Sequence, residues 1–415
     1  MIRFLALASL VLTSVVHAED WPRWRGPNND NKSPETGLLT EWPEGGPKKD
    51  WQVGGLGTGY SSVAVAQGKI FTLGRNDNVE YLFALKQSDG SQLWSTRLGA
   101  GTKEKGPNGT PTVDGNRVYA VSFEGDLVCA DVESGREIWR KNFQRDFNGK
   151  MMSMWGYSES PLIDGDRLIC TPGGPNAMVV ALNKLDGKLI WRAKVPSAQK
   201  GNDGAGYSSI VISNAGGVKQ YVQMIGHGVI SLAAEDGRFL WGYAKIANTT
   251  ANVPSPIVSG NYIFASTGYS DGGSALLEIS GSRGRLTPRE VYYKNAKTLQ
   301  NHHGGMILLD GKIYMGHGHN NGFPCCIDLR SGNPVWGPQR GPGTESAAIT
   351  YADGHLYFRY QDGTMTLIEA SEDGFKLKGK FEEDFNWGPR WAHPVVSGGK
   401  LYLRTNHELA CFNLK

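Results

Sequence analysis

Short runs of alternating apolar and polar residues recur along this chain and are separated by glycine-rich turns. In the main pattern, an apolar run is followed by a polar turn, a Gly and, four residues after that Gly, a Trp. The first copy runs from Ala84 through Gly90 to Trp94, and further copies end at Trp139, Trp191, Trp241 and Trp336. Successive spacings from Trp94 to Trp241 are 45, 52 and 50 residues, and the gap of 95 before Trp336 leaves room for a degenerate copy ending near Tyr292. Periods of this length predict a repeat architecture.

A second pattern precedes each Trp turn. It is a pair of apolar runs joined by Asp-Gly or Gly-Gly, as in residues 111–119, and such a pair predicts a tight hairpin. Each repeat therefore predicts four antiparallel strands, which is the composition of a propeller blade. We expect an all-β fold, an eight-bladed β-propeller over residues 48–415, with blades beginning near Ser61, Thr110, Ser160, Ser208, Ser255, Gly304, Ser346 and Pro394.

The last blade has too few residues for four strands. Residues 48–53 resemble the end of a repeat whose beginning is absent, so we expect them to pair with residues 408–414 and close the ring. The repeated Trp residues are expected to pack between blades, as structural rather than catalytic groups.

The first residues have a different pattern. Arg3 is followed by an apolar run from Phe4 to Val16 and by small residues up to Ala18, which predicts a secretory signal peptide over residues 1–18. The run is too short for a membrane span, which needs about 20 residues. We expect cleavage near Ala18, a periplasmic or secreted protein without a membrane span, and an N-terminal surface loop segment over residues 19–47.

Composition changes this picture little. The 43 basic and 40 acidic residues leave a net charge of +3, which argues against nucleic acid as a partner. We expect a monomer. The five Cys residues lie in apolar runs and are expected to be buried thiols. The adjacent Cys325 and Cys326 should point to opposite faces of one strand, because side chains alternate there.

The repeat Ala-Leu-x-x-x-x-Gly-x-x-x-Trp at Ala84–Trp94 resembles the tryptophan-docking repeat of pyrroloquinoline-quinone (PQQ) dehydrogenases and of BamB-like assembly propellers. The segment Trp21–Pro27 is similar to the opening of uncharacterised exported bacterial propellers of this group. The resemblance covers nearly the whole chain after residue 18. It implies either a PQQ- and calcium-dependent dehydrogenase that oxidises an alcohol or sugar, or a non-catalytic binding module.

The segments that enter the innermost strands should converge on one mouth of the channel. A Gly-Tyr-Ser sequence recurs there, and aromatic rings suit a flat or sugar-like ligand, although such Tyr residues can equally cap blade ends. The candidate ligand-binding residues are Tyr60, Tyr157, Tyr207, Trp155 and Trp391, with Arg359 and Arg404 for an anionic ring group.

Four His residues cluster in blade six. They could bind a transition metal or transfer protons, or they could serve only as hydrogen-bonding loop residues. These residues are His302, His303, His317 and His319.

The resemblance to PQQ dehydrogenases also implies calcium ligands and a catalytic base at the heads of inner strands. Glu159 and Asn252 match the calcium positions, whereas the base position falls near His302 and holds no Asp. His302 is therefore the candidate catalytic residue. The missing Asp favours a ligand- or protein-binding module or scaffold in the cell envelope, with its small-molecule or protein ligand at one channel mouth. The dehydrogenase remains the alternative.

Overall fold

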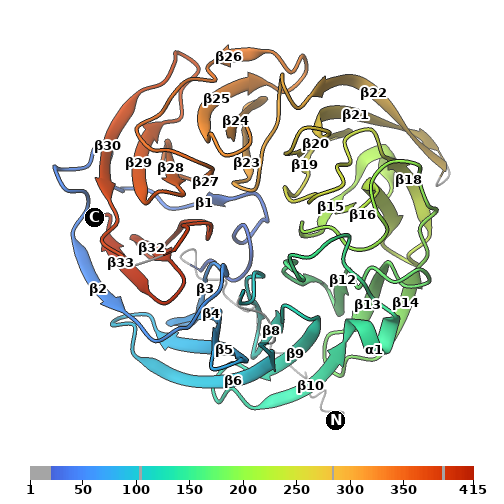
Figure 1. Ribbon diagram of the computed structural model, residues 1–415, viewed down its shortest axis with the longest axis horizontal. Helices are drawn as coiled ribbons and strands as arrows, with labels where there is room; N and C mark the ends of the chain where they lie inside the picture. Colours follow the sequence, from blue (N-terminus) through green and yellow to red (C-terminus); the bar gives the residue numbers. More distant parts are fainter. Residues whose placement is uncertain (1–19, 102–104, 283–284, 386–387) are drawn as a thin grey trace, which may run out of the picture.

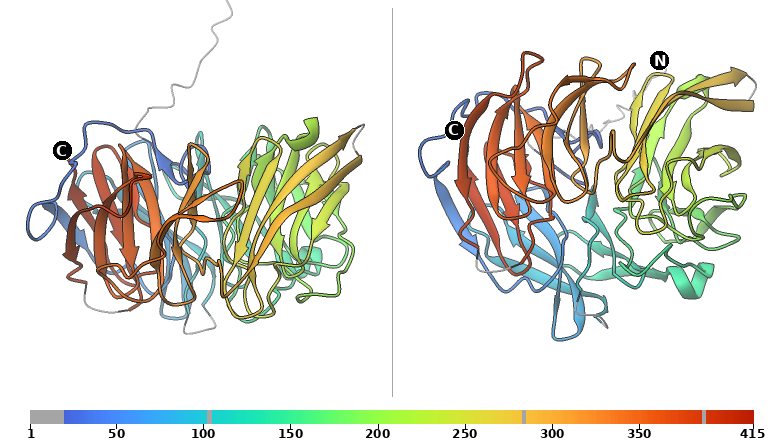
Figure 2. Two further views of the ribbon diagram at one scale, coloured as in Figure 1. Left: turned by 90° about the horizontal axis from the view of Figure 1, so that it is seen from above. Right: turned by 45° about the horizontal axis from the view of Figure 1, so that its top comes forward.

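The computed structural model describes residues 20–101, 105–282, 285–385 and 388–415, and the predicted signal peptide lies outside them. Within these residues the strands form eight sheets of four antiparallel strands around one axis, and a short parallel strand is added to one of them (Figure 1). The side view shows a short cylinder with the strands running between its two faces (Figure 2). The predicted eight-bladed propeller is therefore confirmed. No helix in the described part of the chain is long and apolar enough to cross a membrane.

Each blade begins with its innermost strand. The strands of blades one to four are β3 (Ala64–Ala66), β4 (Lys69–Asn76), β5 (Val79–Lys86) and β6 (Gln92–Ala100); β7 (Thr112–Asp114), β8 (Arg117–Val121), β9 (Asp126–Asp131) and β10 (Glu137–Asn142); β11 (Leu162–Asp164), β12 (Arg167–Cys170), β13 (Val179–Asn183) and β14 (Leu189–Ala193); and β15 (Val211–Ser213), β16 (Gln220–Ile225), β17 (Gly228–Ala233) and β18 (Phe239–Tyr243).

The remaining blades follow the same order. Their strands are β19 (Ile257–Ser259), β20 (Tyr262–Thr267), β21 (Gly273–Ser282) and β22 (Arg285–Asn295); β23 (Met306–Leu309), β24 (Lys312–His317), β25 (Phe323–Asp328) and β26 (Pro334–Trp336); β27 (Ala347–Ala352), β28 (His355–Tyr360), β29 (Thr364–Glu369) and β30 (Leu377–Glu382); and β31 (Val395–Ser397), β32 (Lys400–Arg404), β33 (Leu409–Asn413) and β2 (Lys49–Val53). The short helices are α1 (Phe143–Phe147) and η1 (Ala215–Gly217).

The ring closes as the sequence predicted. β2 pairs antiparallel with β33, with Trp51 opposite Cys411, so the last blade contains strands from both ends of the chain. This pairing leaves no incomplete blade at the junction, and it joins the first and last blades covalently.

The repeated Trp residues pack against the turn of the following blade. The Trp94 ring covers Gly135, where a Cβ atom would lie 2.5 Å from the ring, and its Nε1 donates to the Val132 carbonyl. Gly135 has a φ of 70°, so glycine is required there for both space and backbone conformation. Trp51, Trp139 and Trp191 cover Gly90, Gly187 and Gly237 in the same way.

Three positions depart from this arrangement. Trp336 donates to the Ser371 carbonyl of blade seven and covers no glycine among the described residues. In blade five Tyr292 replaces Trp, covers Gly332 and donates its hydroxyl to the Leu329 carbonyl. Trp241 instead donates to Gln220 of its own blade, because the long β21–β22 hairpin replaces the usual glycine turn in the next blade.

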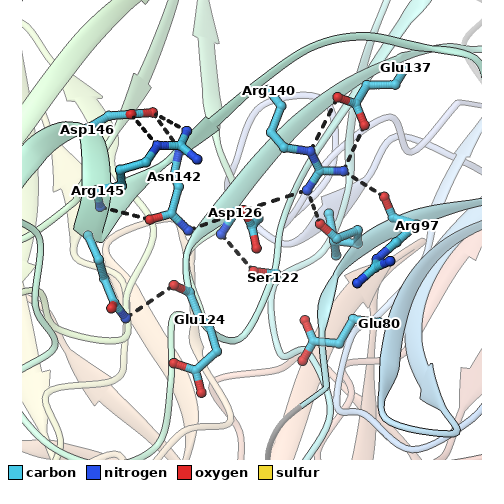
Figure 3. A network of polar contacts seen from close by, with 12 residues as sticks. Glu80, Arg97, Ser122, Glu124, Asp126, Glu137, Arg140, Asn142, Arg145 and Asp146 are labelled. Atoms are coloured by element: carbon cyan, nitrogen blue, oxygen red, sulfur yellow. Dashed lines mark hydrogen bonds and ion pairs between the residues drawn. The ribbon is translucent and has the colours of Figure 1, made fainter.

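Polar contacts also join the outer strands of neighbouring blades. Arg140 of β10 donates to the carbonyls of Arg97 and Leu98 in β6 and pairs with Glu137 (Figure 3). In the same network Asn142 caps the N-terminus of α1 by accepting from the backbone N–H of Arg145.

All five Cys residues are buried free thiols. Cys325 packs in the apolar cluster between blades five and six, and Cys326 in the cluster between blades six and seven. The two side chains therefore lie on opposite faces of β25, as expected from strand alternation.

The segment before β2 differs from the expected surface loop. Residues 20–33 lie inside the ring, where the blue ribbon containing β1 (Lys32–Ser33) crosses the centre (Figure 1). Trp21 and Asn31 are buried, and β1 runs parallel to β27. Trp21 packs in the apolar cluster between blades eight and one, and Asn31 bonds to the Ile349 carbonyl of blade seven, so contacts with several blades hold this stretch inside the ring. Residues 34–47 return to the outside and pack Leu38 and Trp42 on blades seven and eight.

Candidate functional site

A cavity of about 420 Å³ lies on the channel axis, and loops from all eight blades line it. The segments entering the inner strands form most of the wall, so residues far apart in sequence meet here. Trp24 and Arg25 of the N-terminal segment form the floor, and the cavity therefore has the shape of a cup.

Backbone contacts with several blades hold the floor segment in place. Trp21 forms an isolated bridge with Val65 of β3, and the Pro22 carbonyl accepts from Val113 of β7. The Arg25 guanidinium is buried and donates to the carbonyls of Pro256 and Met306 on the opposite side. The segment thus spans the channel from blades one and two to blades five and six.

Hydroxyl side chains at the strand entrances connect one blade to the next. Ser160 Oγ accepts from the backbone N–H of Thr110, Ser209 Oγ accepts from Ser160, and Ser255 Oγ accepts from Ser209, at 2.9–3.0 Å. These bonds satisfy backbone donors that the short inner strands leave free. They fix the spacing of the wall of the cup between blades two and five.

Aromatic rings dominate the upper wall. Tyr60 and Trp391 have ring centroids 4.5 Å apart, and Trp391 Nε1 donates to Gln361. The Lys105 ammonium lies 3.5 Å from the centre of the Trp155 ring, which is a cation–π contact. Tyr207 is fixed by a 2.7 Å hydrogen bond between its hydroxyl and Ser153.

Histidines form the wall at blade six. The ring centroid of His302 lies 4.4 Å from that of His303 and 4.2 Å from that of His319. His302 Nδ1 forms a 2.6 Å hydrogen bond with Ser346 Oγ, which also lies 3.3 Å from the Asn320 Oδ1. His302 Nε2 lies 3.3 Å from the Tyr269 hydroxyl.

Burial keeps these imidazoles neutral. It lowers the pKa of His302 to about 3, with His319 adding to the effect, and it lowers the pKa of His303 well below its usual range. Burial likewise lowers the pKa of His393 to about 4. His393 stacks edge-on against Trp24 of the floor at 4.5 Å. The positive charges of the cup are therefore those of Lys105 and Arg25.

Comparison with known families gives a match over most of the propeller. The family model described as outer membrane protein assembly factor BamB matches residues 42–123 and 80–338. The chain belongs to this BamB family. Among its curated relatives, BamB of Xanthomonas campestris pv. campestris is 31% identical over 106 residues, which is 26% of each protein. BamB of Burkholderia pseudomallei is 28% identical over 201 residues, 46% of this chain and 45% of the relative. The matches thus span from a quarter to just under half of these relatives' length.

Solved structures show the same fold at low sequence identity. BamB from Moraxella catarrhalis has a TM-score of 0.58 at 13% identity, over 85% of this chain and 94% of the other. A europium-containing methanol dehydrogenase has a TM-score of 0.67 at 11% identity, over 96% and 99%. The quinohemoprotein alcohol dehydrogenase from Comamonas testosteroni has a TM-score of 0.65 at 12% identity, over 95% and 80%.

The calcium candidates of this BamB-family chain do not line the cup. Glu159 is buried and accepts from the backbone N–H and hydroxyl of Thr171 and from Gln223. Asn252 is buried and donates to the carbonyls of Ile225 and Gly226, while its oxygen accepts from Asn248. Their ligand atoms are therefore occupied inside the blades, and they do not fit a calcium–PQQ site.

The two arginine candidates also lie away from the cup. Arg359 forms a fully buried ion pair with Glu383, with 2.6 Å between Nη2 and Oε2. Arg404 is buried among backbone carbonyls of residues 56, 57 and 73. Neither arginine is among the described residues that line the cup. Tyr157 is likewise buried and donates to the Pro172 carbonyl, as a residue that caps a blade end does.

The structure divides the histidine candidates. His302, His303 and His319 line the cup, whereas His317 lies behind it and accepts from the backbone N–H of Gln300. Over the described ranges, no group of three or more His, Cys, Asp or Glu side chains is arranged to hold a metal ion. Burial lowers the pKa of His302, His303 and His319, so these three imidazoles are neutral groups that can form hydrogen bonds.

Several lining residues were not predicted. Tyr269 stands in Gly268-Tyr269-Ser270, a further copy of the recurrent Gly-Tyr-Ser sequence, so the motif itself could have identified it. Trp24 and Arg25 belong to the segment expected on the surface. The Trp residues of that segment are the sequence feature that could have indicated its burial. Lys105 and His393 carry no local signal, because whether a loop side chain faces the axis depends on loop conformation.

Proposed function

We propose that this chain is a non-catalytic binding module of the cell envelope, which receives a small-molecule or protein ligand in the cup. The observation that carries the proposal is the lining itself. It consists of aromatic rings, neutral imidazoles and hydroxyl groups around a preformed cavity, and the described lining residues include no carboxylate. Such a surface suits binding of a flat apolar group with a few oriented hydrogen bonds.

The relatives support the envelope setting and a protein partner. They are described as outer membrane protein assembly factors, and the predicted signal peptide supports export. We therefore propose a periplasmic or secreted monomer that acts as a scaffold for other proteins. Cell fractionation and light scattering of the mature protein test the location and the oligomeric state.

Photo-crosslinking tests where the ligand binds. Tyr60→benzoylphenylalanine places the probe in the wall of the cup, and Leu93→benzoylphenylalanine places it on the outer edge of blade one, where Leu93 is 47% exposed. The proposal predicts a discrete adduct from position 60 and none from position 93 in the producing cell. Adducts from position 93 alone would contradict binding in the cup.

A quinoprotein dehydrogenase is the second candidate. His302 supports it by position, because its Nε2 lies 3.3 Å from the Tyr269 hydroxyl at the cavity. Burial lowers the pKa of His302 to about 3, which makes it a weak base and weighs against this candidate. The positions of Glu159 and Asn252 weigh against it, since their polar atoms are already bonded within the blades.

A further inference from the structure

Charge is distributed unequally over the cup. Lys105 makes no ion pair with any residue in the described part of the chain, and its ammonium lies above the Trp155 ring. Arg25 is buried in the floor with its Nε unpaired. With two cations and no carboxylate among the described lining residues, the cavity attracts a negatively charged group.

Unpaired polar atoms lie on the other side. His303 Nε2 and His319 Nδ1 are buried without a hydrogen-bond partner. A buried unpaired polar atom costs free energy that a ligand can recover by bonding to it. Both residues belong to blade six, which faces blade two across an eight-membered ring, and Lys105 lies in the connection that leads into blade two.

Flat rings lie between these two polar ends. Tyr60, Trp155 and Trp391 line the upper wall, and the Trp24 ring lies on the floor. Stacking between offset rings favours a planar unsaturated ligand over a bulky aliphatic one. The site thus has a cationic end, an aromatic middle and a neutral hydrogen-bonding end.

We propose that the cup binds a planar aromatic carboxylate that carries a hydroxyl or similar polar group at its far end. Its carboxylate pairs with Lys105, its ring stacks within the aromatic wall, and its far group bonds to His303 or His319. This inference rests on the proposed binding function and names the ligand class for the same cavity.

The probes are 4-hydroxycinnamate, its uncharged methyl ester and the neutral sugar maltose, each titrated into the mature protein by calorimetry. The acid should bind about tenfold more tightly than the ester, and maltose should not bind measurably. Equal affinity for acid and ester, or binding of maltose alone, overturns the assignment of an anionic ligand.

Paired variants locate the charge. Lys105→Gln should weaken binding of the acid by about two- to fivefold and leave the ester unchanged. Lys245→Gln is the matched control, because Lys245 also lies over an aromatic ring, Tyr293 at 4.4 Å, but outside the cup. His303→Ala should weaken acid and ester equally. An unchanged affinity in Lys105→Gln contradicts the proposal.

The ligand class and the binding function can be tested separately. If none of the three probes binds while the crosslink from position 60 persists, the ligand class is wrong and the binding module stands. If the crosslink from position 60 is also absent, the proposed function fails as well.

Discussion

The Trp139 ring lies directly on Gly187 of the next blade. A Cβ atom at Gly187 would come 2.8 Å from the ring, and the Trp139 Nε1 donates to the Lys184 carbonyl of the same turn at 3.1 Å. Because an aromatic ring covers a glycine in this way in five of the blades, the stability of those blades depends on the turn that follows each of them. The contact can be tested without changing the aromatic residue.

Gly187→Ala should destabilise the protein more than Gly115→Ala. Both glycines have positive φ, 70° and 57°, so both substitutions incur the left-handed backbone cost of about 1–2 kcal/mol. A Cβ at Gly115 meets no atom within 4 Å, whereas one at Gly187 overlaps Trp139, which should add about 1–3 kcal/mol. Urea unfolding measures the difference, and equal losses would argue against docking.

The floor segment should contribute to the stability of the whole ring. Asn31 is 1% exposed and donates to the Ile349 carbonyl at 3.0 Å. Asn31→Ala should lower the free energy of unfolding by about 1–3 kcal/mol more than Asn29→Ala, because it leaves a buried acceptor unpaired. Asn29 is a suitable control, since its φ of 55° is close to the 61° of Asn31. If Asn31→Ala and Asn29→Ala lower the free energy of unfolding equally, the segment is not docked in the channel.

The pH dependence of stability tests the environment of Glu159. Burial raises its pKa from 4.5 to about 8, although the hydrogen bonds from Thr171 act in the opposite direction. The folded state therefore binds a proton that the unfolded state releases between these values. The contribution of Glu159 to the free energy of unfolding is therefore fully present below pH 4.5. It is lost as the pH rises through about 8, by up to about 1.4 kcal/mol per pH unit.

Glu159→Gln should remove this slope between pH 5 and 8, as measured by chemical unfolding. The buried histidines have the opposite sign, but they are unchanged in the variant and cancel in the comparison. Glu44→Gln, at an exposed position, should behave like the unsubstituted protein. The histidines and Glu80, whose pKa burial raises to about 7, titrate in both proteins. A slope in Glu159→Gln equal to that of the unsubstituted protein would mean that the Glu159 carboxylate is charged in the folded state.

The five thiols should be unreactive until the protein unfolds. All are buried, and burial raises the pKa of Cys129 and Cys326 to about 11. We expect Ellman's reagent to detect no thiol in the native protein and five in guanidinium without reductant. Three thiols in guanidinium, together with a 2 Da mass loss at Cys325 and Cys326, would instead indicate a disulfide across adjacent residues.

The sequence predicted the blades because each is a local unit with its own hairpins and Trp turn. It also predicted the pairing of β2 with β33, since the last repeat lacked a strand. The cup was harder to predict. Tyr60, Tyr207 and Trp391 were found from their position at strand entrances, but Tyr157, in the same Gly-Tyr-Ser motif, points into a blade. Side-chain direction there depends on loop conformation, which the motif does not specify.

Charged residues misled the prediction for a different reason. Glu159, Arg359 and Arg404 stand near strand ends, where a ligand site is plausible, but they bond to groups on neighbouring strands or blades, and the buried Nε of Arg404 stays unpaired. Those partners are distant in sequence, so pairing could not be foreseen. Trp24 and Arg25 were missed because a Pro- and Gly-rich segment usually lies on the surface.

The central claim is that the cup binds its ligand without a calcium–quinone site. The most direct measurement is an absorbance titration of PQQ into the mature protein with and without calcium, repeated with Glu159→Gln. We predict no calcium-dependent binding at tens of micromolar PQQ. Any calcium-independent binding should weaken in Lys105→Gln and persist in Glu159→Gln. Calcium-dependent binding that is lost in Glu159→Gln would contradict the account and establish the dehydrogenase site.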